Sequence, residues 1–108
     1  MEVCAITGSS GVLGQKIKKL LPYKFYEFKD DITIYEDVFN WIRKKNFSLL
    51  IHLAAKVPTK DVELNYKHSL KVNHIGTKNI VKALSLKKDK PKWVFFSSTS
   101  HVYKIKKK

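Results

Sequence analysis

Residues 7–14 read Thr-Gly-Ser-Ser-Gly-Val-Leu-Gly and follow directly on the apolar run Val3–Ile6. This pattern is typical of a glycine-rich turn between a buried strand and a helix. Backbone N–H groups and the helix dipole at such a helix start favour bound phosphate groups. We expect Gly8 to allow the tight turn, Gly11 to let phosphates approach the backbone, and Gly14 to let the helix pack closely on the sheet. The motif predicts a pyrophosphate-binding loop, and an ordinary glycine turn is its alternative interpretation.

Apolar runs alternate with amphipathic segments along the chain. The predicted strands are Val3–Thr7, Lys24–Phe28, Leu49–Leu53 and Trp93–Ser97, and the predicted helices are Val12–Leu21, Ile34–Lys45 and Val62–Leu86. Strands that lack an inside–outside alternation are buried on both faces, which indicates a parallel sheet covered by helices. Right-handed crossovers then give the strand order 2-1-3-4. The fold class that we expect is α/β, a partial doubly wound (Rossmann) sheet with helices on both faces.

Two local patterns predict how the first two helices are placed. An apolar stripe on the first helix is expected to face the core; its members are Val12, Leu13, Ile17, Leu20 and Leu21. Thr33 and Glu36 have the spacing of a capping box, so we expect the Thr33 side chain to cap the second helix.

Composition limits the class of protein. The chain has 108 residues, enough for one domain at most, and no apolar run approaches the ~20 residues of a membrane span. Its single cysteine, Cys4, excludes an intramolecular disulfide and fits a reducing cytoplasm. The net charge is +13, but Arg43 is the only arginine among 22 basic residues and the lysines are scattered. Because direct base readout favours arginine, we expect no specific nucleic-acid partner.

Five motifs occur in order along the chain. They read T-G-x-x-G-x-x-G, D-[ILV]-T, H-x-A-[AG], V-N-x-x-G-T-x-N and F-S-S-[ST]-x-x-V-Y, and they occupy Thr7–Gly14, Asp31–Thr33, His52–Ala55, Val72–Asn79 and Phe96–Tyr103. Together they make the chain resemble the extended branch of the short-chain dehydrogenase/reductase superfamily, which includes nucleotide-sugar epimerases, dehydratases and reductases. The resemblance covers essentially the whole chain.

The resemblance implies an NAD cofactor, with NADP possible. Separately, the four histidines, His52, His68, His74 and His101, show no metal-ligand spacing, so we expect no metal site. It implies that Thr99 is the catalytic hydroxyl residue, whereas a strand-end hydroxyl bonded to backbone is the alternative. Asp31 would contact the adenine, and Asp30 is a rival for the ribose. A neighbouring Lys29 could favour a 2′-phosphate, so NAD and NADP both stay open. The cofactor-binding residues that we expect are Gly8, Ser10, Gly11, Val12, Leu13, Gly14, Asp30, Asp31, Ile32, Leu53, Ala54, Ala55, Asn73 and Ser97.

The family also uses a Tyr-x-x-x-Lys pair on a helix beyond the Ser/Thr strand. Tyr103 and Lys107 match the bare pattern, but Tyr103 follows Thr99 by only four residues, so no helix can intervene. We therefore expect residues 1–108 to be the N-terminal part of a dinucleotide-binding domain. The substrate-binding region would be absent and the chain inactive alone, whereas the complete enzyme would act on a nucleotide sugar as a homodimer. The alternatives are a non-catalytic NAD(P)-binding module and a basic nucleic-acid-binding α/β protein.

Overall fold

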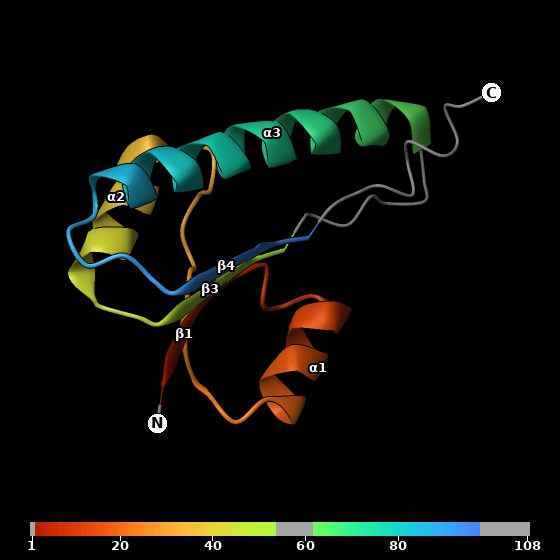
Figure 1. Cartoon of the computed structure of the whole chain (residues 1–108). Helices are drawn as coiled ribbons and strands as arrows, with labels where there is room; N and C mark the ends of the chain where they lie inside the picture. The colour runs from red at the N-terminus through yellow and green to blue at the C-terminus, as the bar shows by residue number, and fades with distance from the viewer. Residues whose placement is uncertain (1, 54–61, 98–108) are drawn as a thin grey trace.

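The computed structural model describes residues 2–53 and 62–97, the side chains of 62–70 excepted. Strands and helices alternate as β1 (Val3–Thr7), α1 (Val12–Leu20), β2 (Lys24–Glu27), α2 (Tyr35–Lys44), β3 (Leu49–His52), α3 (Val62–Leu86) and β4 (Trp93–Phe96). The four strands form one parallel sheet in the order β2-β1-β3-β4. Helix α1 lies on one face of this sheet, and α2 and α3 lie on the other (Figure 1). The predicted fold class and strand order are confirmed.

The register of the sheet brings the ends of three strands together. Thr7 at the end of β1 pairs with His52 at the end of β3, and Ile6 pairs with Glu27 at the end of β2. Because all strands run in one direction, the segments that follow them meet at one edge of the sheet. Ligands of open α/β sheets bind at this carboxyl edge, where the order of the strands reverses.

The core lies between the sheet and the two helices α2 and α3. Its buried members are Ala5, Phe28, Val38, Trp41, Ile42, Phe47, Leu50, Ile80 and Ala83. Trp41 connects α2 to β2. Its ring stacks on the Tyr26 ring, with 5.2 Å between the ring centroids, and its Nε1–H donates to the Glu27 carbonyl at 3.1 Å. The Tyr26 hydroxyl in turn donates to the Trp41 carbonyl at 2.6 Å. Each polar tip of these aromatic residues is thereby satisfied within the core.

Most of the predicted apolar stripe of α1 is exposed, and Ile17 is its one half-buried member. Gly14 is the one buried residue of this helix, and Val12, Leu13 and Leu20 are 65%, 53% and 77% exposed. The reason is that, within the described residues, no second helix lies beside α1 on that face of the sheet (Figure 1). Periodicity identified the apolar side of the helix correctly, but there is no neighbouring layer against which this side could pack.

The predicted capping box is also wrong. Ile34 is the N-cap of α2, and it makes no side-chain cap hydrogen bond. Thr33 instead donates to Asp31 Oδ1 from both its backbone N–H, at 3.0 Å, and its hydroxyl, at 2.7 Å. An aspartate that binds the backbone two residues onward forms a turn of its own, and here this turn competes successfully with the cap.

Candidate functional site

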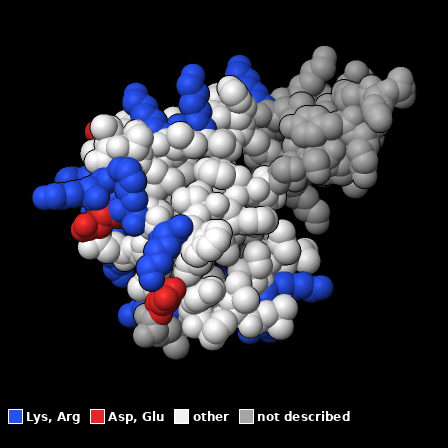
Figure 2. Space-filling view, in the orientation of Figure 1, with Lys and Arg blue, Asp and Glu red and all other residues white. Residues whose placement is uncertain are grey.

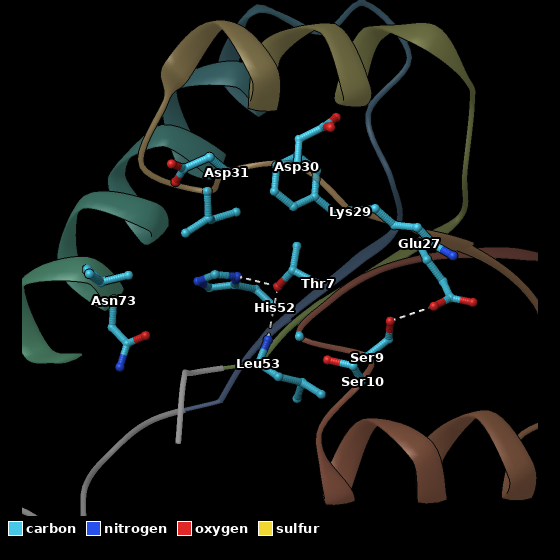
Figure 3. Close-up of a pocket in the computed structure, with 14 residues that line it drawn as sticks. Thr7, Ser9, Ser10, Glu27, Lys29, Asp30, Asp31, His52, Leu53 and Asn73 are labelled. Atoms are coloured by element: carbon cyan, nitrogen blue, oxygen red, sulfur yellow. Dashed lines mark hydrogen bonds between the residues drawn. The ribbon is translucent and has the colours of Figure 1, made fainter. Parts of the chain in front are cut away.

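A pocket of about 750 Å³ opens at the carboxyl edge of the sheet. Its walls come from the loop after β1, the segment after β2, the end of β3 and one side of α3 (Figure 3). The lining residues are Thr7, Gly8, Ser9, Ser10, Glu27, Phe28, Lys29, Asp30, Asp31, Ile32, His52, Leu53, Val72 and Asn73.

The glycines of the loop after β1 have different structural reasons. Gly8 has a φ of +70°, and a Cβ there would lie 3.0 Å from the Cβ of Leu53. A Cβ on Gly14 would lie 2.5 Å from Ser9 Cα, so this glycine lets α1 approach the loop itself rather than the sheet. A Cβ on Gly11 would meet only the Gly8 carbonyl oxygen, at 3.7 Å. The fold therefore requires glycine at positions 8 and 14. At position 11 the fold does not require glycine, so a bound ligand would be the reason for a glycine there.

The start of α1 is open to an anion. Its N-cap, Gly11, offers no side-chain cap, and the first turn contains no acidic residue. The first N–H groups of a helix have no partner within the helix, so they carry partial positive charge and can bind an anionic group. Ser9 and Ser10 lie between this helix start and the pocket (Figure 3).

Thr7 and His52 connect the ends of β1 and β3. The Thr7 Oγ1 accepts the Leu53 N–H at 3.2 Å and lies 2.6 Å from Nδ1 of His52 (Figure 3). Burial lowers the pKa of His52 to about 4, so the ring is neutral at physiological pH. A neutral ring that accepts the Thr7 hydroxyl proton at Nδ1 carries its own proton on Nε2. That nitrogen is buried and has no hydrogen-bond partner within the described part of the chain.

Glu27 is a site residue that sequence reasoning missed. Its Oε1 accepts hydrogen bonds from the Ser9 hydroxyl at 2.6 Å and from Lys18 Nζ at 3.1 Å. These two bonds, the Ser9 bond first, lower the pKa of Glu27 and keep it ionised. Its position at the end of the second strand could have identified Glu27 from the sequence. In dinucleotide-binding folds, an acidic residue some way after the glycine motif binds the ribose.

The segment after β2 is tied to α3. The Asn79 Nδ2–H donates to the Ile32 carbonyl at 2.9 Å, and a Cβ on Gly76 would lie 2.8 Å from Ile32 Cγ1. Asp31 lines the pocket, and the two bonds from Thr33 lower the pKa of its carboxyl. Residues from the D-[ILV]-T and V-N-x-x-G-T-x-N motifs therefore contact one another directly.

The structure brings half of the expected cofactor residues to the pocket wall. These are Gly8, Ser10, Asp30, Asp31, Ile32, Leu53 and Asn73. Four others lie at the start of α1 and not in the pocket lining, namely Gly11, Val12, Leu13 and Gly14. The Ser97 N–H donates to the His52 carbonyl at 2.9 Å, beside the site. Ala54, Ala55 and Thr99 lie outside the described residues, and the binding roles of all of these residues stay predictions.

Neither a metal site nor a membrane span is apparent in residues 2–53 and 62–97. No three His, Cys, Asp or Glu side chains within residues 2–53 and 71–97 gather closely enough to hold a metal ion. No helix among these residues is both long and apolar enough to cross a membrane.

The parallel sheet, its strand order and the glycine loop at its carboxyl edge define a dinucleotide-binding type of α/β domain. More specifically, the chain belongs to the NAD dependent epimerase/dehydratase family, whose model matches residues 4–108. This family is NAD(P)-dependent. A comparison with curated proteins finds no match.

Solved structures agree with this assignment. The chain is similar to dTDP-4-dehydrorhamnose reductase from Bacillus anthracis in complex with NADP, with a TM-score of 0.68 and 28% identity over 79% of this chain. It is also similar to a GDP-L-fucose synthetase from Naegleria fowleri bound to NADP, with a TM-score of 0.57 and 25% identity over 76% of this chain. Uronate dehydrogenase from Agrobacterium tumefaciens, at 18% identity and a TM-score of 0.66, shares the fold. The chain spans 32%, 29% and 42% of these three proteins, respectively.

Proposed function

We propose that this chain is the NAD(P)-binding portion of a nucleotide-sugar epimerase, dehydratase or reductase. The observation that carries the proposal is the pocket itself, whose lining includes Ser9 and Ser10, next to the uncapped start of α1, and acidic residues at and after the end of β2. A dinucleotide is an anionic pyrophosphate between two ribosides, and it needs both features within one groove. When bound, the nicotinamide would accept a hydride from a sugar carbon or return a hydride to it.

The pyrophosphate would lie against the backbone N–H groups from Gly8 to Gly14. Gly11 supports this placement, because folding leaves open space where its Cβ would be. The adenosine ribose would lie near Ser9 and Glu27, whose second carboxylate oxygen has no hydrogen bond within the described residues. The adenine would lie along Ile32, with Asp31 beside its amino group. Leu53, Ala54, Ala55, Asn73 and Ser97 would line the path toward the nicotinamide.

We favour NAD over NADP for this chain. The ionised carboxylate of Glu27 can accept hydrogen bonds from ribose hydroxyls, whereas it would repel a 2′-phosphate. Asp30 adds a second negative charge on the same side of the pocket, and Lys18 and Lys29 oppose the pair. The two solved reductase and synthetase structures contain NADP, so the choice rests on Glu27.

The test of selectivity is a pair of titrations with NAD⁺ and NADP⁺ by calorimetry. We expect tighter binding of NAD⁺, and we expect the Glu27→Gln variant to lose most of that preference because it removes the like charge. Lys92→Gln, at the opposite end of the sheet beside a different pocket, is the matched control. Stronger binding of NADP⁺ by the unaltered chain would reverse the assignment.

The catalytic proposal concerns Thr99, which would hydrogen-bond the reacting oxygen of the sugar. A Tyr/Lys pair would transfer the proton, and Tyr103 does not fill that role. We therefore expect cofactor binding without turnover by residues 1–108. Measurable epimerase or reductase activity of this chain on nucleotide sugars would refute that expectation.

The nucleic-acid-binding alternative can be tested on the same chain. A basic nucleic-acid-binding protein would bind DNA at physiological salt, and a Gly11→Val change, where an added Cβ meets only the Gly8 carbonyl oxygen at 3.7 Å, would leave that binding intact. On the face shown in Figure 2, the Lys and Arg side chains lie mainly around the rim, and uncharged surface occupies its centre. We also propose that the complete enzyme is a homodimer. A reducing, cytoplasmic location is proposed as well, because Cys4 is a free, buried thiol.

A further inference from the structure

We propose that Gly76 and Asn79, on α3, are positioning residues that hold the Asp31–Ile32 segment so that it can recognise an aminopurine base. Neither residue lines the pocket, so both would act through Ile32. The inference rests on the proposed function and deepens it, because it explains how a helix remote from the glycine loop would contribute to base recognition.

The first observation is the hydrogen bond from Asn79. Its Nδ2–H donates to the Ile32 carbonyl at 2.9 Å, across 47 residues of sequence, in a partly buried position. Asparagine is a poor helix former, and α3 would be more stable locally with alanine there. The contact that this residue makes is with the segment after β2 and not with its own helix.

The second observation is the close approach at Gly76. This glycine is buried within α3, and a Cβ there would lie 2.8 Å from Cγ1 and 3.2 Å from Cγ2 of Ile32. Ile32 could not keep its place beside any larger residue. Glycine weakens the interior of a helix, so its presence is explained by the side chain that it accommodates.

The third observation is that the same segment is fixed from its other side. Asp31 Oδ1 accepts both the N–H and the hydroxyl of Thr33, so the turn cannot rotate without losing two hydrogen bonds. The carbonyl of Ile32 is bound to α3 at the same time. What remains for a ligand is the second oxygen of Asp31, an acceptor, in a pocket wall that Ile32 also lines.

An acceptor beside an apolar wall fits a flat heteroaromatic base that carries an amino group. The base would pack on Ile32 and donate its amino hydrogen to Asp31. A base with a carbonyl in place of the amino group would direct an oxygen at the carboxylate and be rejected. Fixing the segment in advance lowers the ordering cost of binding.

The experiment compares ADP with inosine diphosphate, which differs chiefly in replacing the amino group of the base by a carbonyl. Affinities are measured by NMR titration of the full chain and of the variants Asn79→Ala and Gly76→Ala. We expect the unaltered chain to prefer ADP by about fivefold, the value of roughly one hydrogen bond. Both variants should bring the ratio close to one, with the affinity for inosine diphosphate unchanged.

Ser85→Ala is the matched control. Ser85 also lies on α3 and also donates to a carbonyl, but the acceptor is Lys82 in the same helix. This variant should keep the preference for ADP. Alanine is a better helix former than asparagine, serine or glycine, so loss of α3 would not explain the expected result. The Ile32 amide resonance should shift in the two test variants and not in the control.

Each other outcome overturns the inference in a distinguishable way. If ADP and inosine diphosphate bind the unaltered chain equally well, the base is not recognised through Asp31, and the dinucleotide proposal survives. If Asn79→Ala and Gly76→Ala weaken both ligands equally, the two residues support the fold alone. If neither diphosphate binds the unaltered chain, the proposed function fails and the inference fails with it.

Discussion

The two faces of the sheet differ in how completely they are covered. On the α2/α3 face, Val38, Ile42 and Ile80 are buried to within 1% exposure. On the α1 face, Cys4 and Ile6 are buried, but the apolar side chains of α1 itself are exposed. The difference teaches that one helix can bury the central strand, whereas a continuous core requires two adjacent helices.

The same difference in exposure between the two faces is seen within the four residues of β4. Val94 and Phe96 pair with Leu50 and His52 and share the α2/α3 face, where each is 37% exposed. Trp93 and Phe95 point to the other face and are 70% and 56% exposed. Both faces of this all-apolar strand are therefore exposed, the α2/α3 face less so, because the covering layer differs and not because the residues do.

The largest expected effect separates the two faces directly. Ile80→Ala on α3 should destabilise the fold by about 3 kcal/mol, because it removes buried methylene groups and leaves a cavity. Leu20→Ala on α1, at a side chain that is 77% exposed, should change stability by less than about 0.5 kcal/mol. Urea unfolding of both variants measures the contrast, and equal losses would mean that α1 is packed as tightly as α3.

Acid should weaken the α2/α3 face through His52. Its pKa is about 4 in the fold and 6.5 ordinarily, so stability is complete above pH 6.5 and declines as the pH falls toward 4. The full loss is on the order of 3 kcal/mol. His52→Gln should flatten the decline measured by thermal unfolding over this range. The lowered pKa of Glu27 contributes a further loss only below pH 4.5, its ordinary value.

His74→Gln is the control for this pH dependence. His74 lies on the same helix as Gly76, and its side chain is exposed. It should keep the decline of the unaltered chain. A His52→Gln variant with an unchanged slope would show that another group is responsible.

Two glycines sharpen the comparison at the start of α1. Gly14→Ala should destabilise the fold by about 2 kcal/mol, because the added methyl overlaps Ser9 and must displace the helix or the loop. Gly11→Ala should cost under about 1 kcal/mol, because its Cβ meets nothing closer than 3.7 Å. Equal costs, measured by urea unfolding, would contradict the close approach at Gly14.

A small change in folding is also expected on the open face of β4. Phe95→Thr should alter the free energy of unfolding by less than about 1 kcal/mol, because the side chain is more exposed than buried. It should nevertheless reduce self-association, since exposed apolar patches promote it. Light scattering at increasing protein concentration provides the measurement, with exposed Lys88→Thr as control. Unaltered association would place the adhesive surface elsewhere.

Much of the fold followed from local sequence patterns. Runs such as Leu49–Leu53 could be assigned to buried parallel strands, and right-handed crossovers left one strand order. The ends of β1 and α3 were predicted as observed, and β2, β3 and β4 each end one residue earlier than expected. Gly8 and Asp31 were predicted as site residues from spacing and resemblance, and both line the pocket.

The sequence by itself determined the alternation of strands and helices and the glycine loop, because both depend on neighbouring residues. Only the tertiary structure decided that Ser9 and Lys18 bind Glu27, that Gly76 accommodates Ile32, and that the apolar side of α1 faces outward. Each of these depends on partners distant in the chain or on the number of layers over a sheet face. Periodicity and spacing carry no information about either.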